Sequence, residues 1–391
     1  MYYAENEIDQ IVANHDLLTW IGKYINVNKV GSFYFAKCPF HNDFADSMII
    51  SPEEGMFFCP ACGEGGNIIN FIMKYENKSF YEVMQMLRQE LNEENRESTQ
   101  KKKESRICEI NKIAVDSYSD NLTLSKVATE YVHKRKIEDD MREKFKIGYS
   151  YEKGTNLYRI LLQKGFKKEE LIASKIVFSD KEYIADRFYD RLMFPIQDIN
   201  GRYIGFGGRI LSEKSSGKGI KTAKYINSPD SDVFDKSINL YGMNFAKTSE
   251  KDFFILCEGY MDVISMHQAG FTNAVASLGT ALTEGQARLL KNFKDKVYIS
   301  YDSDPAGIKA AIRAIPLLIS HKIDVRFIQL DPYKDPDEII KKKGKEELAK
   351  RVENSLLLSE WAMKTLYITK NYKFIPIFLL LLKISYILLM L

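Results

Sequence analysis

The sequence predicts a multidomain protein of the α+β and α/β classes, with a zinc ribbon, a mixed α/β subdomain, a parallel α/β sheet and a helical C-terminal segment. Three observations lead to this fold class. The chain has 391 residues, enough for two to four domains. Paired Cys and His residues lie in its N-terminal part, and strand-length apolar runs alternate with helical segments from Asp252 onward. A composition of 45% hydrophobic and 28% charged residues is that of an ordinary globular protein.

The N-terminal pattern predicts one structural zinc ion held by Cys38, His41, Cys59 and Cys62. Two ligand pairs, each with a spacing of two residues, can reach one tetrahedral ion from tight turns, and thiolate and imidazole suit zinc rather than magnesium. Chance spacing of buried cysteines is the alternative. The turn-forming Gly63-Glu-Gly-Gly66 behind the second pair favours the zinc site.

The other cysteines, Cys108 and Cys257, are isolated, so the sequence shows no disulfide framework. The N-terminus lacks a basic and then apolar signal. We therefore expect a reducing, cytoplasmic location.

The first domain is expected to span residues 1–91 and to end in an amphipathic helix from Ser79 to Leu91. The charged stretch 92–106 lacks apolar periodicity, which predicts a linker. A second domain then spans residues 107–250. It is helical and polar as far as Gly148.

Short apolar runs interrupted by glycines, Leu192–Ile196 and Tyr203–Gly208, predict strands of a curved mixed sheet in this second domain. They form no GxGxxG fingerprint, so they do not indicate dinucleotide binding. Between Ile199 and Pro229 the cations outnumber the one carboxylate, Glu213, and such a stretch suits a phosphate backbone. These cations are Arg202, Arg209, Lys214, Lys218, Lys221 and Lys224.

Residues 251–333 are expected to form the parallel sheet, followed by a helical segment at 334–373. The predicted strands are Phe253–Cys257, Ala274–Ser277, Val297–Tyr301 and Val325–Leu330. The predicted helices are Asp262–Ala269, Thr283–Phe293 and Gly307–Ser320.

Acidic residues follow three of these strands, at the edge where functional groups of open parallel sheets collect. They are Glu258, Asp262, Asp302, Asp304, Asp335 and Asp337. Carboxylates so placed repel one another unless a hard cation neutralises them, which predicts a Mg²⁺ or Mn²⁺ site. For Asp304 or Asp337 taken singly, an exposed helix N-cap is an equally good interpretation.

Several segments resemble, in order and spacing, the Toprim catalytic fold and zinc ribbon of bacterial-type DNA primases. They are Cys38-Pro-Phe-His41, Asp186–Ile196, Gly205–Arg209, Lys224–Pro229, Glu258-Gly-Tyr-Met-Asp262, Ala276–Thr283, Asp302-Ser-Asp304 and Asp335-Pro-Asp-Glu338. The resemblance covers residues 5 to 345. Several motifs in one order are far more specific than any one of them.

The resemblance implies a role for each residue that matches a family motif. Glu258 matches an acid of metal binding or general acid/base chemistry, and Asp302 and Asp304 match the principal magnesium ligands. Asp262, Asp335 and Asp337 match outer acids for further metal ions. Arg187, Arg209, Lys224 and Lys236 match basic groove positions that meet template or nucleotide phosphates. For Arg187 and Arg209, ion pairs with Asp186 and Asp190 are the alternative.

The implied activity is that of a DNA primase, a DNA-directed RNA polymerase that uses ribonucleoside triphosphates to make an RNA primer on single-stranded DNA during replication. Tyr225 could stack on template bases or serve only in packing. The zinc ribbon would help to select the start site. A non-catalytic nucleic-acid-binding fragment is the alternative. A topoisomerase or a recombination mediator, which also carry Toprim domains, fits neither this length nor the place of the zinc ligands.

The sequence departs from the family in two places. Phe44–Ile50 differs from the family's usual segment, which weakens the expectation of template contacts there. Family members continue into a helical domain that contacts the replicative helicase, whereas this chain ends in the apolar stretch 374–391. Pro376 and Lys383 argue against a functional membrane anchor, and we expect a truncated or frameshifted end.

Overall fold

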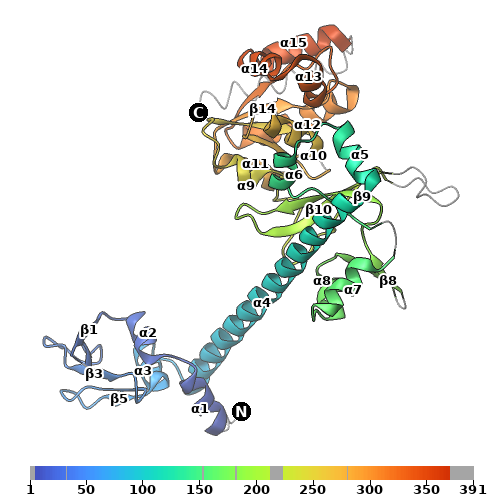
Figure 1. The fold of residues 1–391 in the computed structure, drawn as a ribbon. Coiled ribbons are helices and arrows are strands. Elements are labelled where there is room, and N and C mark those ends of the chain that lie inside the picture. The colour runs from blue at the N-terminus through green and yellow to red at the C-terminus, as the bar shows by residue number, and fades with distance from the viewer. Residues whose placement is uncertain are drawn as a thin grey trace. The chain divides into compact units, whose positions relative to one another are not determined.

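The computed structural model describes residues 5–31, 33–151, 154–180, 183–211, 223–279 and 281–369. The chain divides into two compact units, Met1–Lys102 and Lys103–Leu391 (Figure 1). The apolar stretch 374–391 and three of the predicted phosphate-binding cations, Lys214, Lys218 and Lys221, lie outside the described residues.

The first unit is built on a five-stranded antiparallel sheet in the order β1-β2-β3-β4-β5. The strands are β1 (Val27–Val30), β2 (Phe33–Ala36), β3 (Met48–Ser51), β4 (Met56–Phe58) and β5 (Gly65–Gly66). The helices are α1 (Glu5–Ala13), α2 (Leu17–Gly22) and α3 (Ile68–Tyr75). Ile21, Met48, Ile50 and Phe71 are fully buried in one core. The predicted zinc-ribbon fold is confirmed.

The helix expected to end at Leu91 instead continues, as α4, from Phe80 to Leu124. The stretch 92–106, which the sequence predicts as a linker, is therefore helical. Its Glu, Gln, Lys and Arg residues are good helix formers, and it contains neither Gly nor Pro. The absence of an apolar stripe shows only that this part of the helix has no face to bury.

The second unit begins with a four-stranded sheet in the order β11-β10-β9-β6. Its strands are β6 (Gly148–Tyr149), β9 (Arg191–Gln197), β10 (Tyr203–Ile210) and β11 (Tyr225–Asn227). All three pairings are antiparallel, so the prediction of a mixed sheet is wrong here. Short connections, such as that between β9 and β10, permit only antiparallel neighbours.

The part of the chain before the parallel sheet also contains short helices and a hairpin. They are α5 (Lys126–Lys134), α6 (Asp139–Lys144), α7 (Asn156–Gln163), α8 (Lys168–Ala173), α9 (Met243–Ala246) and the hairpin strands β7 (Val177–Asp180) and β8 (Tyr183–Asp186).

The remainder of the unit is the predicted parallel sheet, in the order β13-β12-β14-β15-β16. The strands are β12 (Phe253–Cys257), β13 (Ala274–Ala276), β14 (Lys296–Ser300), β15 (Asp324–Phe327) and β16 (Leu356–Leu357). The first four pair in parallel, as predicted, and β16 adds an antiparallel edge that the sequence did not suggest. The helices are α10 (Tyr260–Gln268), α11 (Glu284–Lys291), α12 (Pro305–Ser320), α13 (Pro336–Lys343), α14 (Lys345–Glu353) and α15 (Leu358–Thr369).

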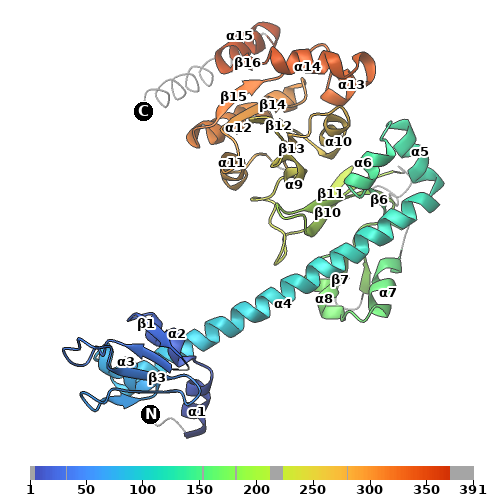
Figure 2. The same ribbon diagram turned by 60° about the vertical axis from the view of Figure 1, so that its left-hand side comes forward.

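Helices cover both faces of this sheet (Figure 2). Along β12, Ile255 and Cys257 belong to one core with residues of α10 and α13, whereas Phe254 and Leu256 belong to a second core with residues of α11, α12 and α15. Because side chains alternate between the faces of a strand, a central strand buried on both sides is apolar throughout. The strand ends, which are free of this packing, can therefore carry the acids.

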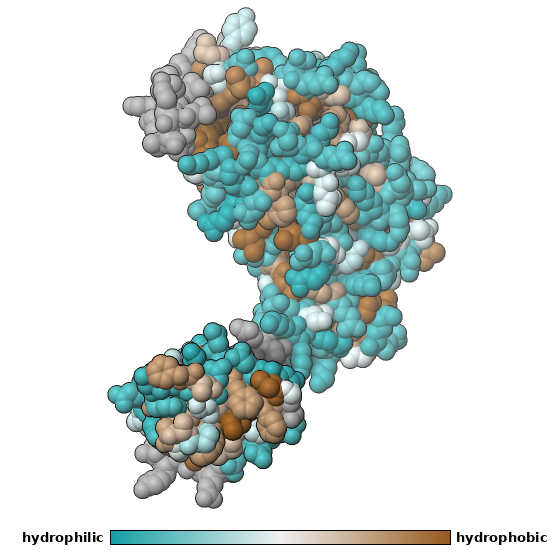
Figure 3. Space-filling model, turned by 90° about the vertical axis from the view of Figure 1, so that its left-hand side faces the viewer, coloured by the Kyte–Doolittle hydropathy of each residue, from teal (hydrophilic) through white to brown (hydrophobic). Residues whose placement is uncertain are grey.

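Apolar side chains also reach the surface of the first unit (Figure 3). Phe33, Phe44 and Phe58 are among them, with 58%, 83% and 52% of their surface exposed. Among the described residues, no helix combines the length and the apolar character that a membrane span needs.

Candidate active site and zinc centre

Four ligand atoms converge in the first unit. Cys38 and His41 follow β2, and Cys59 and Cys62 lie in the turn between β4 and β5. The four atoms lie within 4.8 Å of one another, with 3.7 Å between the sulfurs of Cys38 and Cys62 and 3.9 Å between Cys59 Sγ and His41 Nδ1. Tetrahedral zinc with bonds of about 2.3 Å places two sulfurs roughly 3.8 Å apart. The arrangement therefore fits one zinc ion.

Burial raises the pKa of the Cys38 thiol to about 12, and the nearby sulfurs of Cys59 and Cys62 add to the effect. Thiolates at this position need a cation to stabilise them. The turn that presents the second pair is closed by hydrogen bonds from Cys59 N to Glu64 O and from Gly63 N to Cys59 O. Gly63 has φ +76°, a conformation that favours glycine.

Asp43 holds the backbone beside the ligand Cys38, although the sequence did not single it out. Its carboxylate accepts hydrogen bonds from Cys38 N at 2.8 Å and Ser47 N at 2.7 Å, and these backbone donors hold its pKa well below the usual range. Its Oδ1 lies 3.9 Å from His41 Nε2, the ring nitrogen turned away from Cys59. This carboxylate is near the distal nitrogen of the His41 ring but beyond hydrogen-bond distance. In the sequence, the available indication was that Asp43 lies two residues after the ligand His41.

In the second unit, the parallel strands deliver acids to one edge of the sheet. Glu258 follows β12 directly, and Asp302 lies just after β14. Glu258 Oε1 accepts a hydrogen bond of 2.9 Å from Asp302 N, which ties the two strand ends together. Gly307 packs against both residues, and a Cβ there would lie 2.1 Å from Asp302 O and 2.7 Å from Glu258 Oε1. Only glycine permits this approach.

These strand ends line a cavity of about 290 Å³. Its acidic side chains are Glu258, Asp262, Asp302, Asp335 and Asp337. Its basic side chains are Arg135, Arg209, Lys224 and Lys334. The cavity therefore brings together five of the six predicted acids and two of the four predicted cations, and Tyr225 also lines it.

Burial, and then repulsion between carboxylates, raises the pKa of the acids in this cavity. Desolvation and then Asp302 raise the pKa of Glu258, and desolvation is also the main cause that raises the pKa of Asp302. Desolvation, with Asp335 and Asp302 next, raises the pKa of Asp262 to about 8. A hard divalent cation with oxygen ligands would relieve this repulsion, so the donor set fits Mg²⁺ or Mn²⁺.

The cations repel one another in the same way. Arg209, followed by desolvation and Lys334, lowers the pKa of Lys224. The Arg209 guanidinium donates a 2.7 Å hydrogen bond to the hydroxyl of Tyr225 and lies 5.2 Å and 5.3 Å from the ring centres of Tyr131 and Tyr225. Its recorded partner is thus a tyrosine rather than Asp190. An anion such as phosphate would relieve the repulsion among these cations.

Three predicted site residues do not line the cavity. The Arg187 guanidinium donates to the backbone carbonyls of Lys175 and Val177 and so contributes to local structure. Lys236 lies outside the lining. Asp304 is the N-cap of α12, where its Oδ1 accepts from Ala306 N and Gly307 N, as the N-cap interpretation expects.

Asp337 lines the cavity but already has partners. Its carboxylate is paired with Lys341 at 2.5 Å and with Arg135 at 3.5 Å, and it accepts a hydrogen bond from Ser265. Arg135 lies just after α5 and carried no motif that pointed to it. Lys334 is the other missed cation, and it directly precedes the acidic motif that begins at Asp335.

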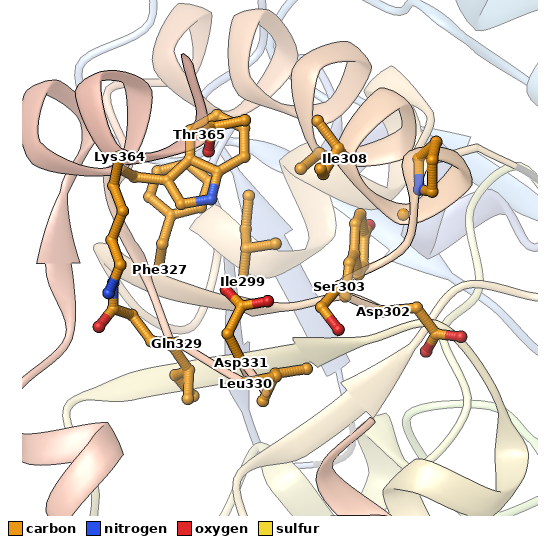
Figure 4. Close-up of a pocket in the computed structure, with 16 residues that line it drawn as sticks. Ile299, Asp302, Ser303, Ile308, Phe327, Gln329, Leu330, Asp331, Lys364 and Thr365 are labelled. Carbon is orange, nitrogen blue, oxygen red and sulfur yellow. The ribbon is translucent and has the colours of Figure 1, made fainter. Parts of the chain in front are cut away.

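A second cavity, of about 270 Å³, lies between α12 and α15. Asp302 lines both this cavity and the acidic cavity, whereas Gly307 lines only this one. Figure 4 shows that its lining combines apolar side chains, such as Ile299, Ile308 and Phe327, with polar ones, such as Gln329, Asp331 and Lys364. Of the predicted acids this cavity contains only Asp302, whereas five of them line the first cavity.

Three family models match successive parts of the chain. The CHC2 zinc finger matches residues 3–103, the N-terminal domain of the DNA primase catalytic core matches residues 117–247, and a Toprim-like model matches residues 255–340.

Similar proteins match over most of the chain. A DNA primase of Clostridium acetobutylicum is 35% identical over 377 residues, which cover 95% of this chain and 62% of that protein. The crystal structure of the zinc-binding and RNA polymerase domains of Aquifex aeolicus primase superimposes with a TM-score of 0.62 and 38% identity, covering 94% of this chain and 89% of that one. A primase catalytic domain bound to single-stranded DNA gives a TM-score of 0.59 and 33% identity, covering 68% of this chain and 83% of that one.

Proposed function

The chain belongs to the DNA primase family, and on this premise we propose that it synthesises short RNA primers on a single-stranded DNA template. It spans 62% of the length of the Clostridium relative, so the proposal concerns this chain's own site. The observation that carries the proposal is the single cavity in which acids of three strand ends face Arg209, Lys224 and Arg135. Such a cavity suits a metal-bound triphosphate.

The acids would hold the divalent metal. Glu258 and Asp302 come first, because a direct hydrogen bond joins their strand ends and desolvation raises the pKa of both. Asp262 and Asp335 complete the acidic wall. Asp304 does not line the cavity and its Oδ1 caps α12, so only its other oxygen would be available to the metal. When bound, one or two metal ions would stabilise negative charge on the attacking and leaving oxygens of nucleotidyl transfer.

The basic residues would orient the nucleotide. Arg209 is held between two tyrosine rings and presents its guanidinium to the cavity, where it can bind two phosphate oxygens. Lys224 adds a second positive charge. The neighbouring cations repel this charge and lower the pKa of Lys224, so a phosphate would be a favourable partner. Glu258 would either hold metal or take the proton of the primer's 3′-hydroxyl, for which its raised pKa suits it.

Two surfaces would meet the template. Tyr225, which lines the cavity, offers a ring beside Arg209, and base stacking on such rings tolerates any sequence. In the zinc unit, the exposed rings of Phe33 and Phe58 offer a second stacking surface for start-site selection. Because phosphate contacts release counterions, template binding should weaken as salt increases.

Primer synthesis on single-stranded DNA with labelled ribonucleotides tests the proposal. We expect the wild-type chain to make primers with Mg²⁺ or Mn²⁺, and Asp302→Ala or Glu258→Gln to reduce the yield by at least about a hundredfold. DNA affinity at fixed salt should persist in both variants, because Arg209 and Lys224 remain in place.

Retained synthesis in folded Asp302→Ala protein would reject the assigned site. A wild-type chain that binds DNA but makes no primer would instead favour the non-catalytic nucleic-acid-binding fragment.

A further inference from the structure

Hydrogen bonds join the backbone at Tyr333 and Lys334 to the loop that carries Asp302. Ser303 N donates a 3.0 Å hydrogen bond to Lys334 O, and Ser303 Oγ donates one of 2.7 Å to Tyr333 O. On the other side, Lys334 N donates to Glu338 Oε2 at 2.7 Å. The backbone of Lys334 is therefore fixed against the acidic loop, although its side chain is 61% exposed.

The ammonium of Lys334 lies over Asp302. Its Nζ is 3.3 Å from Asp302 Oδ2, and only 18% of the Asp302 side chain is exposed. Asp304 and Asp335 lie near enough to act on the same ammonium. A lysine in this position supplies one positive charge at the oxygen that a divalent ion would ligate.

A divalent ion and this ammonium would compete for the same carboxylate. Mg²⁺ ligates oxygens at about 2.0–2.1 Å, and two cations on one oxygen repel each other. The fixed backbone keeps the ammonium close, so its effective concentration at Asp302 is high whatever the metal concentration. A bound ion requires the side chain to swing away, and its exposure leaves room for that.

We propose that Lys334 is a built-in counter-cation for Asp302, which a divalent metal must displace, so that this lysine sets the metal concentration at which the site fills. The inference rests on the proposed metal site. It deepens that function by assigning to Lys334 a regulation of metal loading.

Lys342 provides a matched control. It lies on α13, its Nζ pairs with Glu338, and its side chain is 60% exposed, close to the value for Lys334. It does not line the acidic cavity. Loss of the Lys342 charge changes the net charge of the protein as much as loss of the Lys334 charge does. It leaves the ion pair between Lys334 and Asp302 intact.

The test measures Mn²⁺ binding to the full chain by electron paramagnetic resonance, without nucleotide or DNA and with the structural zinc in place. We expect Lys334→Met to bind Mn²⁺ about fivefold more tightly than wild type, as for the loss of one partly exposed ion pair. Lys342→Met should stay within about twofold of wild type, and Lys334→Arg, which keeps the charge, should bind no more tightly than wild type.

A second measurement follows the lysine itself. Reductive ¹³C-methylation preserves the charge, and the resonance that is missing in Lys334→Met identifies Lys334. We expect this resonance to shift when Mg²⁺ is added to wild type and to stay in place in Asp302→Asn.

Each outcome decides between defined ideas. Equal Mn²⁺ affinity in Lys334→Met and wild type, or an equal gain in Lys342→Met, would overturn the role of Lys334. If Asp302→Asn did not weaken Mn²⁺ binding, the metal site assigned under the proposed function would itself be wrong. That outcome is distinguishable from a failure of the role of Lys334 alone.

Discussion

Replacement of Asp262 by Asn should stabilise the metal-free second unit. Asp262 lies in the first turn of α10, where its Oδ2 accepts a 3.1 Å hydrogen bond from Gly259 N. Desolvation, together with Asp335 and Asp302, raises its pKa to about 8. Asn keeps the accepting oxygen and the volume but removes the ionisable group.

The direction of the effect follows from the protons bound in each state. With a folded pKa near 8 and an ordinary value of 3.8 when unfolded, the folded state keeps a proton that the unfolded chain releases. Stability is therefore lost as pH rises from about 4 to about 8. Asp262→Asn avoids this loss, so its advantage is absent near pH 4 and complete above pH 8.

The size of the advantage follows from the shift. At about 1.4 kcal/mol per pKa unit, a shift from 3.8 to about 8 amounts to about 6 kcal/mol. Asp262 is still partly exposed, and water screens part of the repulsion. We therefore expect a gain of about 2–3 kcal/mol in the free energy of unfolding at pH 8.

Urea unfolding without added divalent metal measures this gain. The chain has two tryptophans, Trp20 in the zinc unit and Trp361 in the second unit, where Trp361 stacks on Phe327 with 4.1 Å between ring centres. A Trp20→Phe background leaves a fluorescence signal from the second unit alone. Equal stability of the two proteins at pH 8, or a gain that persists at pH 4, would refute the reasoning.

Three further predictions concern the zinc centre, the strand-end glycine and the basic wall. Cys62→Ser should release zinc and unfold the ribbon but leave the second unit folded, as zinc content and circular dichroism would show; zinc-free wild-type protein would contradict this. Gly307→Ala should cost about 2–3 kcal/mol and weaken Mn²⁺ binding, because its Cβ meets Asp302 O, and an unchanged urea midpoint would count against the clash. Arg209→Met should reduce the salt dependence of single-stranded DNA binding, whereas Arg187→Met should not, because its guanidinium serves backbone carbonyls; equal effects would reject that distinction.

Chemical identity and spacing in the sequence determined the zinc ligands and the sheet that carries the acids. Cys38 and Cys62 could be paired from the sequence because ligand turns are local, and β12 could be placed because a strand buried on both faces is apolar throughout. Asp304 caps α12, in agreement with the N-cap interpretation. The same interpretation is wrong for Asp337, because the cap of α13 is Asp335 and Asp337 lies in the first turn of that helix.

Only the tertiary structure decided which side chains share the cavity. Arg135 and Asp337 are 202 positions apart, and no local pattern encodes their ion pair. Arg187 and Arg209 both match basic positions of the family, yet the Arg187 guanidinium binds backbone carbonyls whereas Arg209 lines the cavity. The physical reason is that motif spacing fixes the backbone locally, whereas the direction and the partner of a long charged side chain depend on packing between segments distant in the sequence.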